Sequence, residues 1–284
     1  MTGHTLDSPS NTDLITHSNA ISSNGCSVND AIIVENLTMA YGEQIIQQDL
    51  NFTIKRNDIF IIMGNSGSGK STLMRAMTGL SRPSSGDVFY HCDNVHNGFW
   101  QASEAMQLNI MEQFGVMFQN GALFSSMTLL ENVSLRLTQS TKYSPGRIRK
   151  IAAFKLALVG LKGFEHYYPA EISGGMQKRV GIARAMAMDP PILFFDEPSA
   201  GLDPVSSKLL DDLLLELQDS MGITMVIVTH ELDSIFAIGN NAIFLDNEQK
   251  TIIAKGNPKE LLANNHHEQV QAFLSRGKLL RGQE

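Results

Sequence analysis

Long hydrophobic runs are absent from this sequence of 284 residues. Its longest apolar stretches, such as Ile59–Met63, suit buried strands and are too short to cross a bilayer. Cysteine is also scarce: Cys26 and Cys92 lack a metal-binding or redox spacing and provide no disulfide framework. The first thirty residues contain no Lys or Arg, which argues against a secretory or mitochondrial targeting segment. Together these absences favour a cytosolic location.

Positive charge is in deficit as well. The chain has 22 Lys and Arg against 29 Asp and Glu, a formal net charge of −7, and no long basic run. This balance disfavours broad electrostatic binding to nucleic acid or to anionic lipid. The remaining composition, 43% hydrophobic and 18% charged, is that of an ordinary globular protein. The length allows one large α/β domain with a smaller subdomain.

The chain is organised as a polar tail followed by one α/β unit without internal repeats. Residues 1–29 are rich in Ser, Thr and Asn and poor in large apolar residues, so we expect a mobile tail. Residues 81–118 are mixed in character. The predicted strands are 31–34, 50–54, 59–63, 115–118, 192–195, 224–229, 242–245 and 251–254. The predicted helical segments are 70–80, 128–167, 173–188, 205–217 and 270–280.

A glycine-rich turn joins one predicted strand to one predicted helix. Gly64–Ser71 fits the P-loop pattern, whose glycines let backbone N–H groups converge on a phosphate at the positive end of a helix. Lys70 is expected to reach the β- and γ-phosphates, and the Ser71 hydroxyl to ligate Mg²⁺. A chance glycine turn is the alternative, but the flanking strand and helix are the context that a P-loop requires. The predicted nucleotide-binding residues of this segment are Gly64, Asn65, Ser66, Gly67, Ser68, Gly69, Lys70, Ser71 and Thr72.

A second buried strand, 192–195, leads directly into Asp196 and Glu197. Strands of a parallel sheet deliver the residues at their carboxyl ends to the edge where the P-loop also lies. We expect Asp196 to hold Mg²⁺, usually through water, and Glu197 to polarise the water that attacks the γ-phosphate. Acids at the end of a strand are often simply solvated, so this pair gains its meaning from the P-loop upstream.

Two glycines follow a serine where another helix is predicted to begin, at Ser173, Gly174 and Gly175. Free N–H groups, a hydroxyl and the absence of obstructing side chains make this helix start an anion-binding site. Because the P-loop already serves one triphosphate, we expect this second cradle to close on the γ-phosphate bound by another copy of the chain. An ordinary capped helix is the alternative.

The order of these motifs resembles that of ABC transporter nucleotide-binding domains, and Ile172–Gln177 resembles their LSGGQ signature. The resemblance covers about residues 31–274. It implies an α/β P-loop NTPase core with an antiparallel β subdomain and a helical subdomain at about 125–172. The nucleotide-binding domain would span 30–264, followed by a helical extension at 265–284. The implied cofactors are ATP and Mg²⁺, and the implied assembly is a homodimer with two ATP molecules between P-loop and signature.

Four further positions take roles by the same resemblance. Tyr41 matches the aromatic that stacks on adenine, Gln119 the Q-loop glutamine, Asp203 the D-loop and His230 the switch histidine. Plainer alternatives are a turn aromatic for Tyr41, a structural role for His230 and a helix N-cap for Asp203. The resulting catalytic group is Glu197, His230, Lys70 and Gln119, and the metal ligands are Ser71, Gln119 and Asp196. The residues assigned to nucleotide beyond the P-loop are Tyr41, Ser173, Gly174, Gly175 and Asp203.

Within that family, Phe118–Phe124, Met176 in the signature and Lys255–Leu261 resemble the MlaF-type branch. That branch implies a lipid transporter that maintains outer-membrane asymmetry, with an MlaE-like permease and an MCE-domain protein. It would place the chain on the cytoplasmic face of the inner membrane. Residues 93–112 and the first thirty depart from the branch pattern, which leaves the substrate and the partner open. The alternatives are an ABC transporter for another substrate, a soluble ABC ATPase without a permease and, ranked last, a P-loop kinase.

Overall fold

A computed structural model describes residues 29–90, 98–119, 121–264 and 266–275. The strands are β1 Asp30–Tyr41, β2 Gln44–Lys55, β3 Ile59–Gly64, β4 Ser85–Tyr90, β5 Phe114–Met117, β6 Ile192–Asp196, β7 Thr224–Val228, β8 Asn241–Leu245 and β9 Ile252–Gly256. The α-helices are α1 Lys70–Met77, α2 Glu104–Glu112, α3 Leu129–Ser140, α4 Pro145–Leu158, α5 Gly174–Ala185, α6 Pro204–Met221, α7 Leu232–Ile238, α8 Pro258–Asn264 and α9 Glu268–Leu274. A single 3₁₀ turn, Pro169–Glu171, precedes α5 among the described residues.

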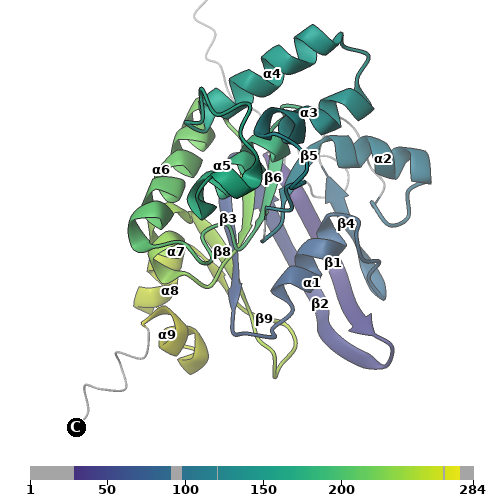
Figure 1. Cartoon of the computed structure of the whole chain (residues 1–284). Coiled ribbons are helices and arrows are strands. Elements are labelled where there is room, and N and C mark those ends of the chain that lie inside the picture. The colour runs from purple at the N-terminus through teal and green to yellow at the C-terminus, as the bar shows by residue number, and fades with distance from the viewer. Residues whose placement is uncertain (1–28, 91–97, 120, 265, 276–284) are drawn as a thin grey trace, which may run out of the picture.

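Two sheets organise the molecule (Figure 1). The larger sheet has the strand order β5-β6-β7-β3-β8-β9, with parallel neighbours except for the antiparallel pair β8 and β9. The smaller sheet is antiparallel, in the order β2-β1-β4. Helices α6, α7 and α8 line the side of the molecule away from this smaller sheet. The four strands β6, β7, β3 and β8 therefore end side by side, at the edge where the predicted site residues follow.

Strand β3 shows why the two faces of the larger sheet carry separate cores. All six of its residues are buried. Alternate side chains point to opposite faces of a strand, so Ile59, Ile61 and Met63 pack with the helices α3 to α7, whereas Phe60 and Ile62 pack toward the smaller sheet and α1. A strand buried on both faces is apolar throughout, which is why the sequence pattern alone located it.

The helices α3, α4 and α5 pack against one another beyond the end of the larger sheet. Each begins at a side-chain cap: Thr128 for α3, with a reciprocal contact from Glu131, Ser144 for α4 and Ser173 for α5. The predicted helical stretch 128–167 is thus two helices, because Ser144 caps a new helix that starts at Pro145. Residues 159–168 are not helical.

Some observed elements are longer than predicted, and others were not predicted at all. The strands predicted at 31–34 and 50–54 are parts of the twelve-residue strands β1 and β2. Strand β4 and helices α2, α7 and α8 were not predicted. The predicted helix 270–280 corresponds to α9, and residues 276–284 lie outside the described residues. So do both cysteines and the predicted tail 1–29, apart from Asn29.

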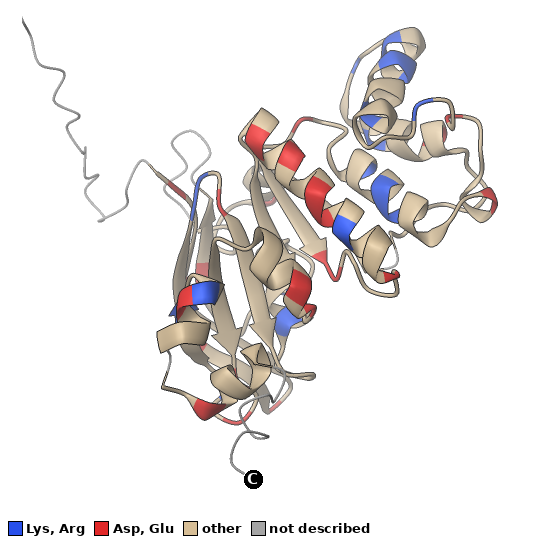
Figure 2. Ribbon diagram, turned by 90° about the vertical axis from the view of Figure 1, so that its left-hand side faces the viewer, with Lys and Arg blue, Asp and Glu red and all other residues tan. Residues whose placement is uncertain are grey.

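No described helix combines the length and the apolar character that crossing a membrane would require. Helix α6 is the longest, with 18 residues, and its exposed face is acidic. Figure 2 shows Asp and Glu along this helix, whereas Lys and Arg are concentrated on the helices α4 and α5.

A buried acid lies where α6 packs on α7. Asp211 is 6% exposed and accepts a hydrogen bond of 2.8 Å from Ser234 Oγ. Burial, helped by the charges of Asp212 and Asp233 and opposed by the hydrogen bond from Ser234, raises the pKa of Asp211 to about 6. Because the folded protein favours the protonated acid, this carboxyl costs stability as the pH rises from its unfolded value near 4 through 6.

Asp211→Asn is therefore expected to stabilise the protein at alkaline pH. The amide preserves a partner for Ser234 and cannot ionise, so the melting temperature should rise by about 3 °C at pH 8. The gain should shrink steadily as the pH is lowered from 7 toward 4. Thermal unfolding of both proteins across this range tests the prediction, with the exposed Asp212→Asn as control. A gain that does not depend on pH would contradict it.

Candidate active site

The glycine-rich turn after β3 is shaped by steric limits at two glycines. Gly64 has φ +149°, and a Cβ there would lie 2.3 Å from the Leu245 carbonyl oxygen. Gly69, with φ +85°, is the N-cap of α1, and a Cβ there would lie 2.8 Å from the Ile46 side chain. Both the backbone conformation and the space therefore require glycine. The turn leaves the N-terminus of α1 open toward a pocket.

Lys70 and Ser71, the first two residues of α1, face the strand ends. Lys70 Nζ donates hydrogen bonds of 2.9 Å to the carbonyls of Gly64 and Asn65. Burial lowers the pKa of Lys70, while the charges of Glu197 and Asp196 oppose that change. An ammonium group held only by carbonyls can exchange them for the oxygens of an anionic ligand.

The strand β6 brings Asp196 to the same place. Ser71 Oγ lies 3.1 Å from Asp196 Oδ1. Burial raises the pKa of Asp196, against the opposing hydrogen bond from Ser71 and nearby cations. A carboxylate and a hydroxyl are ligands suited to Mg²⁺, which usually takes one or two carboxylates and completes its shell with phosphate and water. The described residues contain no cluster of three or more His, Cys, Asp or Glu.

Glu197 follows immediately, in a left-handed conformation with φ 50°. Its Oε1 lies 2.8 Å from His230 Nδ1, and its side chain is only 11% exposed. Its other oxygen, Oε2, is buried and has no hydrogen-bond partner among the described residues. His230 is more exposed, at 57%, and its Nε2 lies 3.5 Å from Glu231 Oε1. A buried acceptor without a partner carries a desolvation cost that a bound water would relieve.

These groups surround a pocket of about 680 Å³. It is lined by Ile46, Gly64, Asn65, Ser66, Gly67, Gly69, Lys70, Ser71, Thr72, Gln119, Glu197, His230 and Phe273. The structure thus brings together the P-loop and the predicted catalytic residues, which come from strand ends up to 166 positions apart (64 to 230). Asp196 and Ser68 lie next to this pocket without lining it.

Tyr41 does not line the pocket. It ends β1, is 54% exposed and pairs with Gln44 across the hairpin to β2. Ile46, in the next strand, lines the pocket instead.

The signature residues also lie outside this pocket in the single chain. Ser173 and Gly174 are exposed at the start of α5, and Ser173 Oγ accepts from the Met176 amide at 3.3 Å. Asp203 caps α6, accepting from the amides of Val205 and Ser206. The Ser206 side chain lowers the pKa of Asp203. Within the single chain, Asp203 therefore acts as the helix N-cap that was considered as its alternative role.

Three residues of the site region were missed in the sequence. Gln47 is fully buried, and its Nε2 donates to the carbonyls of Ser68 at 2.8 Å and Asp246 at 2.7 Å, which braces the P-loop from β2. Ile46 and Phe273 line the pocket, and the Phe273 ring packs edge-on against Phe244 at 5.2 Å. Their contacts are long-range, so no local pattern signals them.

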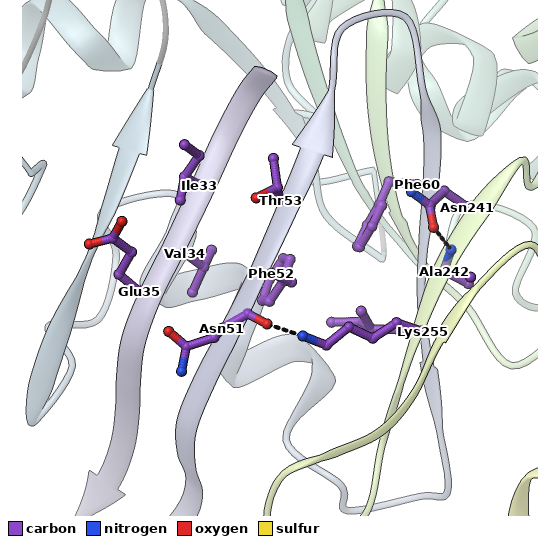
Figure 3. A pocket seen from close by; sticks show the side chains of 12 residues that line it. Ile33, Val34, Glu35, Asn51, Phe52, Thr53, Phe60, Asn241, Ala242 and Lys255 are labelled. Carbon is purple, nitrogen blue, oxygen red and sulfur yellow. Dashed lines mark hydrogen bonds between the residues drawn. The ribbon is translucent and has the colours of Figure 1, made fainter. Parts of the chain in front are cut away.

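A second groove, of about 530 Å³, lies near the opposite ends of the strands (Figure 3). It runs between β2 and the residues Phe60 and Asn241, and Lys255 reaches across it to the Asn51 carbonyl. None of the predicted site residues lines it. The predicted catalytic residues Lys70, Gln119, Glu197 and His230 all line the pocket at the P-loop instead.

A parallel sheet whose strands end at a P-loop, an acidic pair and a histidine defines a nucleotide-hydrolysing P-loop protein. Residues 47–200 match the family described as ABC transporter. The chain belongs to this family: it is the ATP-binding subunit of an ABC transporter, an ATPase coupled to transport, with the ABC ATPase fold.

Three similar proteins illustrate the relationship. The probable ribonucleotide transport ATP-binding protein Mkl of Mycobacterium tuberculosis is 37% identical over 254 residues, which are 89% of this chain and 69% of that protein. The intermembrane phospholipid transport system ATP-binding protein MlaF of Haemophilus influenzae is 32% identical over 84% of this chain and 89% of its own. The solved dimer of the ATP-binding cassette MJ0796 with ADP and Pi has a TM-score of 0.70 at 32% identity, covering 80% of this chain and 98% of that chain.

The relatives do not single out one substrate. Proteins named for glycine betaine and methionine transport also match, at 37% and 34% identity. The resemblance to the MlaF-type branch is thus one of several of similar strength.

Proposed function

We propose that this chain hydrolyses ATP as a homodimer and drives a membrane permease that moves phospholipid. The observation that carries the hydrolytic part is the contact between Glu197 Oε1 and His230 at the pocket, while Glu197 Oε2 is buried and finds no hydrogen-bond partner in the described part of the chain. In this proposal Glu197 accepts the proton of the attacking water, and His230 orients Glu197 and contacts the γ-phosphate.

The remaining roles in this proposal are those that the family resemblance implies. Lys70 exchanges its two carbonyl partners for the phosphates, and Ser71, Asp196 and Gln119 would hold Mg²⁺, which would neutralise negative charge on the phosphate oxygens. Tyr41 stacks on the adenine from the end of β1. The P-loop amides and Thr72 enclose the phosphates at the start of α1.

A second copy completes each site in this proposal. Ser173, Gly174 and Gly175 lie outside the pocket of their own chain, exposed at a helix start that suits an anion. They and Asp203 therefore serve the nucleotide of the partner, and ATP draws the two copies together. The solved MJ0796 cassette is a dimer, which supports this arrangement.

The surface after Gln119 is the proposed link to the permease. Phe124 is 49% exposed, while buried Asn132 fixes its backbone, accepting from the Phe124 amide at 2.8 Å and donating to its carbonyl at 3.1 Å. A rigidly held exposed aromatic suits protein contact. The proposed partners are an MlaE-like permease and an MCE-domain protein, at the cytoplasmic face of the inner membrane. The MlaF relative, matched over most of both chains, supports phospholipid as the substrate.

Purification of the tagged chain from native membranes tests this proposal. We expect a polytopic membrane subunit to co-purify, and phospholipid supplied in nanodiscs to stimulate ATP hydrolysis by the complex. Glycine betaine and methionine, the substrates named for other relatives, are the matched controls. Stimulation by one of these solutes and not by phospholipid would replace the lipid assignment, and isolation without any membrane subunit would contradict the coupling to a permease.

A further inference from the structure

Helix α5 carries three cations, Lys178, Arg179 and Arg184, and no acid. Figure 2 shows this concentration of Lys and Arg on the helices around it. Lys178 is 9% exposed and Arg184 is half-buried, yet neither forms a salt bridge with a described carboxylate. Buried cations are costly unless their donors are satisfied, so these two side chains require other acceptors.

Both cations donate to backbone carbonyls of the short segment that follows β5. Lys178 Nζ donates to the Gln119 carbonyl and lies 3.4 Å from the carbonyl of Glu197. Arg184 donates to two carbonyls, to Ala122 at 2.6 Å and to Gly121 at 2.9 Å. Gln119, Gly121 and Ala122 are thus all held by side chains from one helix.

The two residues whose carbonyls accept from Arg184 have an unusual backbone conformation. Gly121 and Ala122 both have positive φ, 66° and 46°. Two successive residues in this region bend the chain sharply, and a non-glycine residue keeps such a conformation only where its surroundings enforce it. The two hydrogen bonds from Arg184 supply that enforcement at both residues.

Burial strengthens these contacts. It lowers the pKa of both Lys178 and Arg184, with Glu197 and Asp196 raising that of Lys178 in opposition. Hydrogen bonds from a cation in such a partly desolvated setting are stronger than those between neutral groups. These hydrogen bonds link Gln119, Gly121 and Ala122 to α5.

Helix α5 and the residues bonded to it, Gln119, Gly121 and Ala122, form a unit that reaches two different sites. Gln119 lines the nucleotide pocket of its own chain, whereas Ser173, at the start of α5, lies outside that pocket. Lys178 is five residues from Ser173, which is about 8 Å along a helix. In the proposed dimer, Ser173 meets the γ-phosphate held by the partner, so the unit spans both nucleotide sites.

We propose that Lys178 and Arg184 are positioning residues that couple the two nucleotide sites of the dimer. When Ser173 engages the partner's γ-phosphate, α5 shifts, and the two cations carry Gln119 and the Glu197 backbone into place in their own site. The coupling rests on the proposed dimeric function. It makes hydrolysis cooperative in ATP, because occupation of one site prepares the other.

The test is the ATP dependence of hydrolysis by the full-length protein and by Lys178→Met and Arg184→Met. For the wild type we expect a Hill coefficient that approaches about 2, the number of sites. In both variants we expect a value near 1 and a kcat about tenfold lower. Binding of a fluorescent ATP analogue to the single chain should stay within about twofold of wild type, because neither side chain lines the pocket. A merely structural defect would lower activity without flattening the ATP dependence.

Matched variants sharpen the result. Lys178→Arg and Arg184→Lys keep a cationic donor and should restore part of the cooperativity, while Lys150→Met, an equal charge change on the exposed face of α4, should behave as wild type. Wild-type cooperativity in Arg184→Met would overturn the coupling, even if Lys178→Met does not fold. If the wild type itself shows no cooperativity and Glu197→Gln does not dimerise with ATP, the proposed dimer fails and the coupling falls with it.

Discussion

Glu197→Gln is expected to lower kcat for ATP hydrolysis by about a thousandfold, the scale of a lost general base. The amide is nearly the same size as the carboxylate and can keep a hydrogen bond to His230 Nδ1, now 2.8 Å from Oε1. It cannot accept a proton from water. Because Glu197 is buried and its backbone is held by the Val228 carbonyl, the substitution should leave the fold intact.

The measurement is phosphate release at saturating ATP, together with light scattering. With hydrolysis blocked, ATP should hold two copies together, so the variant should run as a dimer with ATP and as a monomer with ADP. Glu216→Gln, the same change at an exposed position of α6, should keep the wild-type rate. A wild-type rate in Glu197→Gln would mean that another group activates the water.

The P-loop and the ends of the parallel strands could be predicted from the sequence because their signals are local. The strand β3 is buried on both faces, so it is apolar at every position but its final glycine, and Gly64 and Gly69 occupy conformations that only glycine tolerates well. Parallel strands then bring residues that follow them to one edge, whatever their separation in sequence. This rule predicted that Asp196 and Glu197 lie at the same edge as the P-loop, where the structure places them.

The full length of β1 and β2 and the supports of the site could not be predicted in this way. Register shifts interrupt the pairing of β1 with β2, and Asn36 and Asp49 have positive φ, so the two-residue alternation of a strand is broken. Gln47 acts through contacts with Ser68 and Asp246, the second of which lies 199 positions away. A buried amide of this kind has no sequence signature. The same holds for Lys178, whose acceptors are backbone carbonyls.

Gly174→Glu is expected to abolish most of the ATPase activity while leaving the isolated chain stable. Gly174 is exposed at the first position of α5, is not among the glycines with positive φ, and a Cβ there would meet no atom within 4 Å. An acidic side chain in the first helical turn also complements the helix dipole. Within a single chain, therefore, nothing opposes the substitution, and the melting temperature should stay equal to that of the wild type or rise slightly.

In the proposed dimer, by contrast, the substitution at Gly174 is unfavourable. If Gly174 faces the γ-phosphate held by the partner, a carboxylate there fills the space and repels the phosphate, since two like charges about 4 Å apart cost roughly 4 kcal/mol near a protein surface. We expect kcat to fall by about a hundredfold or more, with ATP binding to the single chain unchanged. In the Glu197→Gln background, Gly174→Glu should also prevent dimerisation by ATP. Gly146→Glu is the matched control, because Gly146 lies in the first turn of α4 and is equally free of neighbours. Wild-type hydrolysis by Gly174→Glu would show that the start of α5 does not approach the nucleotide, and that each chain completes its site alone.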